Sequence, residues 1–206
     1  MRDGFEYFME RFGVGFDRRE VSGKVIEKYN NRLPQKLLEY WKTYGWCGYA
    51  RGLFWTVNPE DYEPVVAAFL EGTKFEADDT YHVIAKGAFG ELYLWGEKTF
   101  NCLTIAACLN HFSYDETASV KKSDAWAIEF FFAFQSPEDN DFEGFFEKAS
   151  TELGALKYDE IYGFFPAFTL GGMLEFKNLK KVKDVEHLLF LAQLAPMQQF
   201  TFPGDV

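Results

Sequence analysis

Residues 33–57 hold a dense group of aromatic rings, and this density limits the possible folds more than any other feature of the chain. The segment reads LPQKLLEYWKTYGWCGYARGLFWTV, and its rings belong to Tyr40, Trp41, Tyr44, Trp46, Tyr49, Phe54 and Trp55. Such density is typical of a heavily packed small domain or of a surface that binds a partner. The segment has no nucleophile beside a base and no row of metal ligands. It therefore favours recognition over proton-transfer chemistry.

The composition predicts a folded chain with a substantial core. Of 206 residues, 48% are hydrophobic and 24 are Phe, which excludes intrinsic disorder. This length suits one large domain or two small ones.

Features of the sequence argue against export and membrane insertion. The N-terminus, MRDGFEYFMERFG, lacks the unbroken apolar run of a signal peptide. The most apolar stretch, residues 125–134, contains Glu129 and is too short to span a bilayer. Three Cys residues without a CxxC spacing indicate reduced thiols and no disulfide framework. We therefore expect a cytoplasmic protein that is not attached to a membrane.

The net charge of −11 is unevenly distributed. Residues 58–79 carry seven Asp or Glu against the single Lys74, and residues 124–160 carry ten against two Lys. Such runs form either a solvated surface or a surface that attracts a basic partner. Direct binding to nucleic acid is disfavoured, because it needs clustered Lys and Arg.

The first half of the chain predicts helices followed by an antiparallel meander. Ser22 and Asn58 are placed as N-caps, and Gly45 as a helix end. Helices are expected at residues 5–12, 22–30, 34–44 and 59–70. Strands are expected at 52–57, 81–86, 91–95 and 101–106, with Gly-rich turns between the last three. Trp46, Tyr49 and Arg51 fall in a Gly-containing turn that is expected at the surface.

The second half is predicted to be mostly helical. Residues 111–122 lack periodicity and are taken as the boundary between a domain at 1–110 and a module at 111–206, which are expected to pack as one unit. Helices are expected at 125–134, 142–153 and 185–194, a turn at 137–140, and a strand at 161–170. Lys177, Lys180, Lys181 and Lys183 are placed near the start of the last helix. The predicted class is α+β: N-terminal helices on an antiparallel meander, then a mostly helical C-terminal lobe with a short strand pair.

Two parts of the sequence resemble known bacterial modules. LPQKLLEYWKTYGWCGYARGLFWTVNPEDY and YHVIAKGAFGELYLWGE are similar to the GAD-like domain of bacterial immunity proteins. DEIYGFFPAFTLGG and LKKVKDVEHLLFLAQL are similar to the C-terminal module that accompanies this domain. The resemblance implies a protein that binds and neutralises a type VI secretion effector, typically a DNase. It implies no catalytic residue and no specific contact.

The partner expected from this resemblance is a secreted nuclease, whose DNA groove must be basic. The protein itself is expected to be a monomer when free. Aromatic anchors and acidic side chains are the candidate contacts, although most of the rings are equally expected in the core. The candidate contact residues are Trp46, Tyr49, Arg51, Phe54, Trp55, Glu60, Asp61, Asp78, Asp79, Glu138, Asp139 and Asp141.

No motif in the sequence predicts catalysis, a metal or a cofactor. Cys47 has no flanking signature of a nucleophile, and Cys102, Cys108 and His111 do not form the paired motifs of a structural zinc site. The acidic clusters do not match a calcium loop. Two alternatives to toxin binding stay open: a regulatory scaffold that binds another protein, and an enzyme that uses Cys47 or buried carboxylates.

Overall fold

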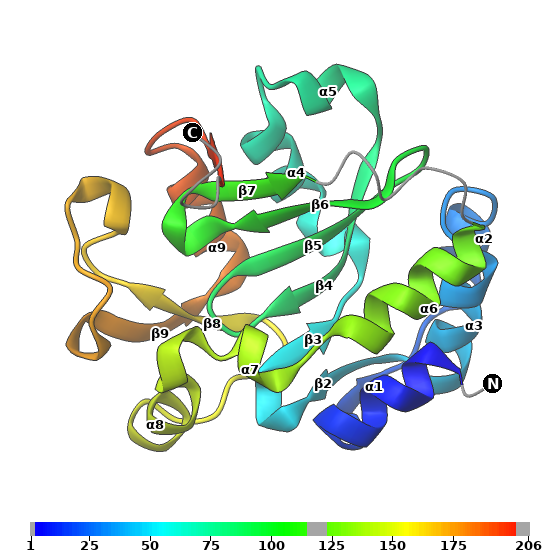
Figure 1. The fold of residues 1–206 in the computed structure, drawn as a ribbon, viewed down its shortest axis with the longest axis horizontal. Helices are drawn as coiled ribbons and strands as arrows, with labels where there is room; N and C mark the ends of the chain where they lie inside the picture. Colours follow the sequence, from blue (N-terminus) through cyan, green and yellow to red (C-terminus); the bar gives the residue numbers. More distant parts are fainter. Residues whose placement is uncertain (1–2, 115–122, 201–206) are drawn as a thin grey trace.

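The computed structural model describes residues 3–114 and 123–200, with Asn101 and Cys102 described by their backbone alone. In these residues the main sheet has eight strands in the order β1-β2-β3-β4-β5-β6-β7-β10 (Figure 1). Every neighbouring pair is antiparallel except β7 with β10. The strands are β1 Phe16–Arg19, β2 Trp46–Tyr49, β3 Phe54–Thr56, β4 Tyr81–Gly87, β5 Glu91–Gly96, β6 Phe100–Ala106, β7 His111–Tyr114 and β10 Gln198–Gln199. The meander expected at 81–106 is confirmed.

Helices cover both faces of this sheet. The N-terminal helices α1 (Gly4–Phe12), α2 (Gly23–Tyr29) and α3 (Gln35–Tyr44) are followed by α4 (Glu63–Leu70) and α5 (Lys74–Asp78). In the second half lie α6 (Asp124–Phe134), α7 (Pro137–Asn140), α8 (Phe145–Glu152) and α9 (Asp184–Ala192). Helix α6 crosses in front of the sheet beside α1, whereas α4 and α9 lie behind it (Figure 1). The predicted α+β class, with its short strand pair β8 (Glu160–Phe164) and β9 (Leu179–Lys183), is confirmed.

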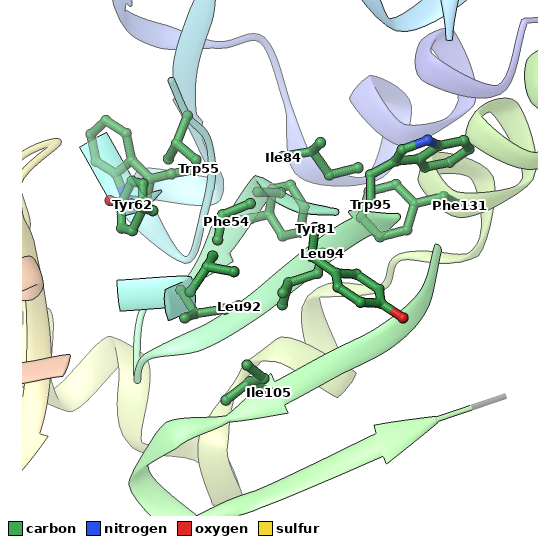
Figure 2. Packing of buried hydrophobic residues seen from close by; sticks show 14 of the residues in the cluster. Phe54, Trp55, Tyr62, Tyr81, Ile84, Leu92, Leu94, Trp95, Ile105 and Phe131 are labelled. Atoms are coloured by element: carbon green, nitrogen blue, oxygen red, sulfur yellow. The ribbon is translucent and has the colours of Figure 1, made fainter. Parts of the chain in front are cut away.

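Adjacent residues of β3 show how the two layers of helices bury the sheet. The Phe54 ring packs near Phe8 of α1 and near Tyr93, with centroid distances of 5.2 and 5.4 Å. The Trp55 ring points to the other face, where it meets Tyr158 at 6.0 Å. Successive strand residues point to opposite faces, so a sheet covered on both sides buries both rings (Figure 2).

Several local predictions are confirmed by their caps. The Ser22 hydroxyl accepts a hydrogen bond from the Val25 N–H at 3.3 Å, and the Asn58 side chain accepts one from the Glu60 N–H at 3.3 Å. Gly45 follows α3 with φ of 73°, a conformation that favours glycine. Helix α2 begins directly after Ser22, and after Asn58 a 3-10 turn at Pro59–Tyr62 leads into α4.

Other local predictions are wrong. Residues 46–49, expected in a turn, form the interior strand β2, which pairs with the edge strand β1 and with β3. Lys180, Lys181 and Lys183 lie in β9, a strand that was not expected there, although β9 ends directly before α9 and Lys183 is the N-cap residue of that helix. Residues 137–140 form the short helix α7. The domain boundary expected at 111–122 stays a prediction: residues 111–114 form β7 of the main sheet, and 115–122 lie outside the described residues.

A buried ion pair joins the sheet to the C-terminal part of the chain. The Lys86 ammonium in β4 donates to the Asp184 carboxylate at the start of α9, and to the Tyr158 carbonyl at 2.6 Å. The Tyr62 hydroxyl also donates to Asp184, at 2.5 Å. All three side chains that meet here are buried. Charges this deep are stable only when paired, so the contact fixes α9 against the sheet.

Candidate partner-binding surface

The structure places the four predicted aromatic anchors inside the protein, where they cannot contact a partner. Trp46, Tyr49, Phe54 and Trp55 are 6%, 1%, 0% and 0% exposed. The expectation that Trp46 and Tyr49 lie in a surface turn is therefore wrong. Their segment forms the interior strands β2 and β3, and the four rings fill the core, which was the alternative expectation.

Arg51, which was predicted as a contact together with these four rings, is exposed to solvent. It lies in the turn between β2 and β3 with φ of 62°, a left-handed conformation that is uncommon for residues other than glycine. Its guanidinium is 3.8 Å from the carboxylate of Glu147 in α8. Arg51 is thus accessible, at a point where the N-terminal sheet meets the acidic part of the chain.

The carboxylates of Glu60 and Asp61 are largely engaged within the protein. The Lys28 ammonium donates to Glu60 at 2.7 Å, and this hydrogen bond lowers the pKa of Glu60. Asp61 accepts a hydrogen bond from the Tyr158 hydroxyl at 3.1 Å, and burial raises its pKa. Both carboxylates thus tie the turn before α4 to α2 and to Tyr158, and they offer less charge to a partner.

Asp78 and Asp79 are neighbours with different surroundings. The Asp79 carboxylate accepts hydrogen bonds from the Thr99 hydroxyl at 2.7 Å and from the N–H groups of Lys98 and Thr99 at 2.9 and 2.8 Å. It therefore holds the turn between β5 and β6. Asp78 is exposed, and its carbonyl accepts a hydrogen bond from the Lys98 ammonium.

Glu138, Asp139 and Asp141 lie on α7 and just after it. Glu138 and Asp139 are exposed, whereas Asp141 accepts a hydrogen bond from the Phe146 N–H at 2.8 Å. They belong to a longer acidic stretch, since residues 123–147 contain seven Asp or Glu and no Lys, Arg or His. Arg51 contacts the last acidic residue of this stretch, Glu147. Asp78 and Asp79 lie elsewhere, beside the turn between β5 and β6.

Sequence reasoning missed an exposed row of rings on α6. Trp126, Phe130 and Phe134, here called the α6 stripe, are 42%, 36% and 66% exposed. The opposite side of the helix is buried through Ala127, Ile128, Phe131 and Phe132. The spacing i, i+4, i+8 is visible in the sequence and places the three rings on one helical face. Their exposure is not visible, because it depends on what packs against α6.

Nucleophilic and titratable side chains are mostly buried or paired. Burial raises the pKa values of the Cys47 and Cys108 thiols, which disfavours the reactive thiolate. His82 lies 2.8 Å from the Glu97 carboxylate, which also accepts from Arg32 at 2.8 Å.

Across residues 3–114 and 123–200, apart from the undescribed Cys102 side chain, no cluster of three metal-binding side chains is found. Of the helices in those ranges, none has the length and apolar character that crossing a bilayer requires.

One solved structure shares this arrangement of elements over nearly the whole chain. The crystal structure of Atu4351 from Agrobacterium tumefaciens matches with a TM-score of 0.84 and 22% sequence identity, covering 98% of this chain and 94% of that chain. At this identity the match establishes a shared fold. A search of curated protein sequences found no match.

Family models match both halves of the sequence. Residues 125–195 match the model described as T6SS immunity protein Tdi1, C-terminal, which supports an immunity-protein role. Residues 3–109 match the model of the GAD-like domain, in agreement with the resemblance noted from the sequence. Because this second match covers more than half of the chain, the protein belongs to the GAD-like domain family.

Proposed function

We propose that this protein neutralises a type VI secretion DNase in the cytoplasm of the producing cell by binding the toxin and covering its basic DNA groove. The observation that carries the proposal is the match of residues 125–195 to the C-terminal domain of a type VI immunity protein. The immunity role follows from that family. The DNase target and the mode of inhibition are our inference from charge.

The charge argument rests on the acidic stretch at residues 123–147. A DNase must offer positive potential to phosphates, so its groove is attracted to a surface of opposite sign. Glu138 and Asp139 are exposed, and the stretch that contains them has no Lys, Arg or His. Such a surface would raise the rate of association and compete with DNA for the groove.

The proposal is tested by expressing the neighbouring upstream reading frame, with and without this protein. We expect degradation of chromosomal DNA when the toxin is made alone, intact DNA when both are made, and co-purification of the two. The proposal fails if the toxin is not a nuclease, or if cells survive without a complex being formed.

The charge mechanism has a separate test in the purified complex. Glu138→Lys with Asp139→Lys is expected to slow association roughly tenfold at low salt, since rim charges act mainly on the on-rate. Glu20→Lys with Glu27→Lys makes the same charge change on exposed positions of the more basic N-terminal part and serves as the control. Equal rates for both variants, or association insensitive to ionic strength, would refute occlusion by charge even if immunity holds.

A further inference from the structure

A cavity of about 440 Å³ opens where helix α9 packs against the strand pair β8 and β9. The cavity, here called the α9 pocket, is lined by Phe165, Val182, Lys183, Glu186, His187 and Phe190. The three residues from α9 share one side of the helix, because they are three and four positions apart. None of the contact residues predicted from the sequence lines this pocket, so it is a separate candidate site.

His187 is the unusual member of the lining. Its side chain is 7% exposed, yet neither ring nitrogen has a hydrogen-bond partner within residues 3–114 and 123–200. Burial lowers the pKa of His187, so the ring is neutral at pH 7 and offers one donor and one acceptor. A buried polar group without a partner costs stability. A ligand that forms a hydrogen bond with this imidazole would recover that cost.

Gly163 and two phenyl rings set the position of the imidazole. A Cβ at residue 163 would lie 2.5 Å from Nε2 of His187, so a side chain there would collide with the ring. The centroids of Phe165 and Phe190 lie 5.1 and 6.2 Å from that of His187, with planes inclined by 36° and 33°. Packing against phenyl groups satisfies no ring nitrogen. It orients His187 and leaves its hydrogen-bonding capacity for another molecule.

The charges around the α9 pocket nearly cancel. Lys183 donates to the Asp159 carboxylate, so its charge is compensated. The Lys180 ammonium lies 5.2 Å from the centroid of the Phe165 ring. The exposed carboxylate of Glu186 forms no ion pair or hydrogen bond with the described residues. One cation and one anion beside a mostly apolar space favour a neutral ligand, because a charged one would meet a like charge.

We propose that the α9 pocket receives a Tyr side chain of the toxin, whose ring fills the apolar space and whose hydroxyl forms a hydrogen bond with His187. A phenol is neutral and packs well against phenyl rings. Its hydroxyl both donates and accepts, so it can pair with either nitrogen of the imidazole, whereas an aliphatic side chain would leave His187 unsatisfied. Tyr is also enriched at the centres of interfaces. This inference rests on the proposed function, because it names one point of contact with the toxin.

The first test uses p-cresol, which is a Tyr side chain as a free molecule, and toluene, which lacks only the hydroxyl. Affinities are measured by ligand-detected NMR. The imidazole signal of His187, one of three His in the chain, is assigned by its absence in His187→Leu. We expect p-cresol to shift this signal and to bind roughly fivefold more tightly than toluene. His187→Leu keeps the pocket apolar, so it should bind the two compounds equally.

Two further variants keep this test decisive if His187→Leu does not fold. Phe190 is 42% exposed, so Phe190→Ala should fold, and it should weaken p-cresol binding roughly tenfold. Phe168→Ala removes a ring of similar exposure outside the pocket and should stay within about twofold. Melting temperatures within a few degrees of the unmodified protein show that a variant is folded. Equal binding of p-cresol and toluene by the unmodified protein, or an unshifted His187 signal, would overturn the assignment.

The second test measures binding to an inactive form of the product of the neighbouring upstream reading frame. We expect Phe190→Ala to weaken this binding roughly tenfold and Phe168→Ala to stay within about twofold. One Tyr→Phe change in the toxin should cost as much as His187→Leu, and combining the two should cost no more.

The outcomes separate this inference from the proposed function. If Phe190→Ala binds the toxin like the unmodified protein, the α9 pocket is not a contact, although immunity stands. If Phe168→Ala alone loses binding, the toxin docks on the loop after β8, and the inference is wrong. If the upstream product does not bind the unmodified protein at all, the proposed function fails. The p-cresol titration then decides by itself whether the pocket selects a phenol.

Discussion

Two groups of aromatic side chains in this molecule have opposite surroundings. The rings between Trp46 and Trp55 lie in central strands with helices on both sides, and almost none of their surface reaches water. The rings of the α6 stripe lie on a helix that packs through its other face, and they are 36–66% exposed. The first group lies in the core, whereas the second is partly exposed to solvent.

The difference between the groups comes from layering and not from local aromatic content. When both faces of a sheet are covered, side chains on both faces of a strand are buried, as Phe54 and Trp55 show. An outer helix buries only the face that packs on the protein, so an apolar residue on its other face stays exposed. Mutations in the first group should therefore cost more stability than mutations in the second.

The largest effect is expected for Trp55→Ala. This change removes a fully buried ring and leaves the Gly52 carbonyl without the indole N–H that donates to it at 3.0 Å. We expect a loss of about 3–5 kcal/mol in the free energy of unfolding, measured in urea. A loss below about 1 kcal/mol would mean that the ring is not buried between the layers and would break the comparison.

Asp184→Ala tests the ion pair within the same interior. Lys86 would keep a buried ammonium without its carboxylate, and Tyr62 would lose its acceptor. The expected cost is about 3 kcal/mol in urea unfolding. Lys183→Ala is the matched control, because its pair with Asp159 lies at the surface and should leave stability nearly unchanged.

Asp79→Ala tests whether a predicted contact residue is structural. Its carboxylate holds the turn at Lys98 and Thr99, so we expect a loss of about 1–2 kcal/mol on thermal or urea unfolding. Affinity for the toxin should be unchanged. The neighbouring Asp78→Ala should alter neither stability nor affinity. A drop in affinity for either variant would mean that this region contacts the toxin.

Phe134→Ala should have the smallest effect on stability. The side chain is 66% exposed, so the free energy of unfolding should change by no more than about 0.5 kcal/mol. A loss as large as that of Trp55→Ala would show that the α6 stripe is packed against something in the folded protein. The comparison between inner and outer rings would then fail.

Local signals in the sequence predicted much of the fold. Gly-rich turns separate the strands at 81–106, and Ser22 and Asn58 form caps that need only neighbouring residues. The strand at residues 46–49 was not predictable in this way. Gly45 and Gly48 indicate a turn, whereas the pairing of β2 depends on β1 and β3. The strand formed by the Lys residues directly before α9 was missed for a similar reason, because β8 supplies the pairing.

The candidate site was less predictable than the fold. Acidic residues such as Glu138 were found from charge alone, and the structure places them at the surface. The α6 stripe was hidden because Trp126, Phe130 and Phe134 follow the same helical repeat as their buried neighbours, one step around the helix. Only the positions of α1 and α3 decide which of the two rows faces water.

The pairing of β10 with β7 bears on how the chain can be divided. The Gln198 N–H donates to the Asn110 carbonyl at 3.0 Å, and the Phe200 N–H to the Phe112 carbonyl at 2.7 Å. A fragment cut at residue 109 would leave the edge of β6 bare, as a template for self-association. If the chain is instead divided between residues 114 and 123, one fragment holds β7 and the other holds its partner strand β10. Such a pair is a natural starting point for a split reporter whose signal appears only on reassembly.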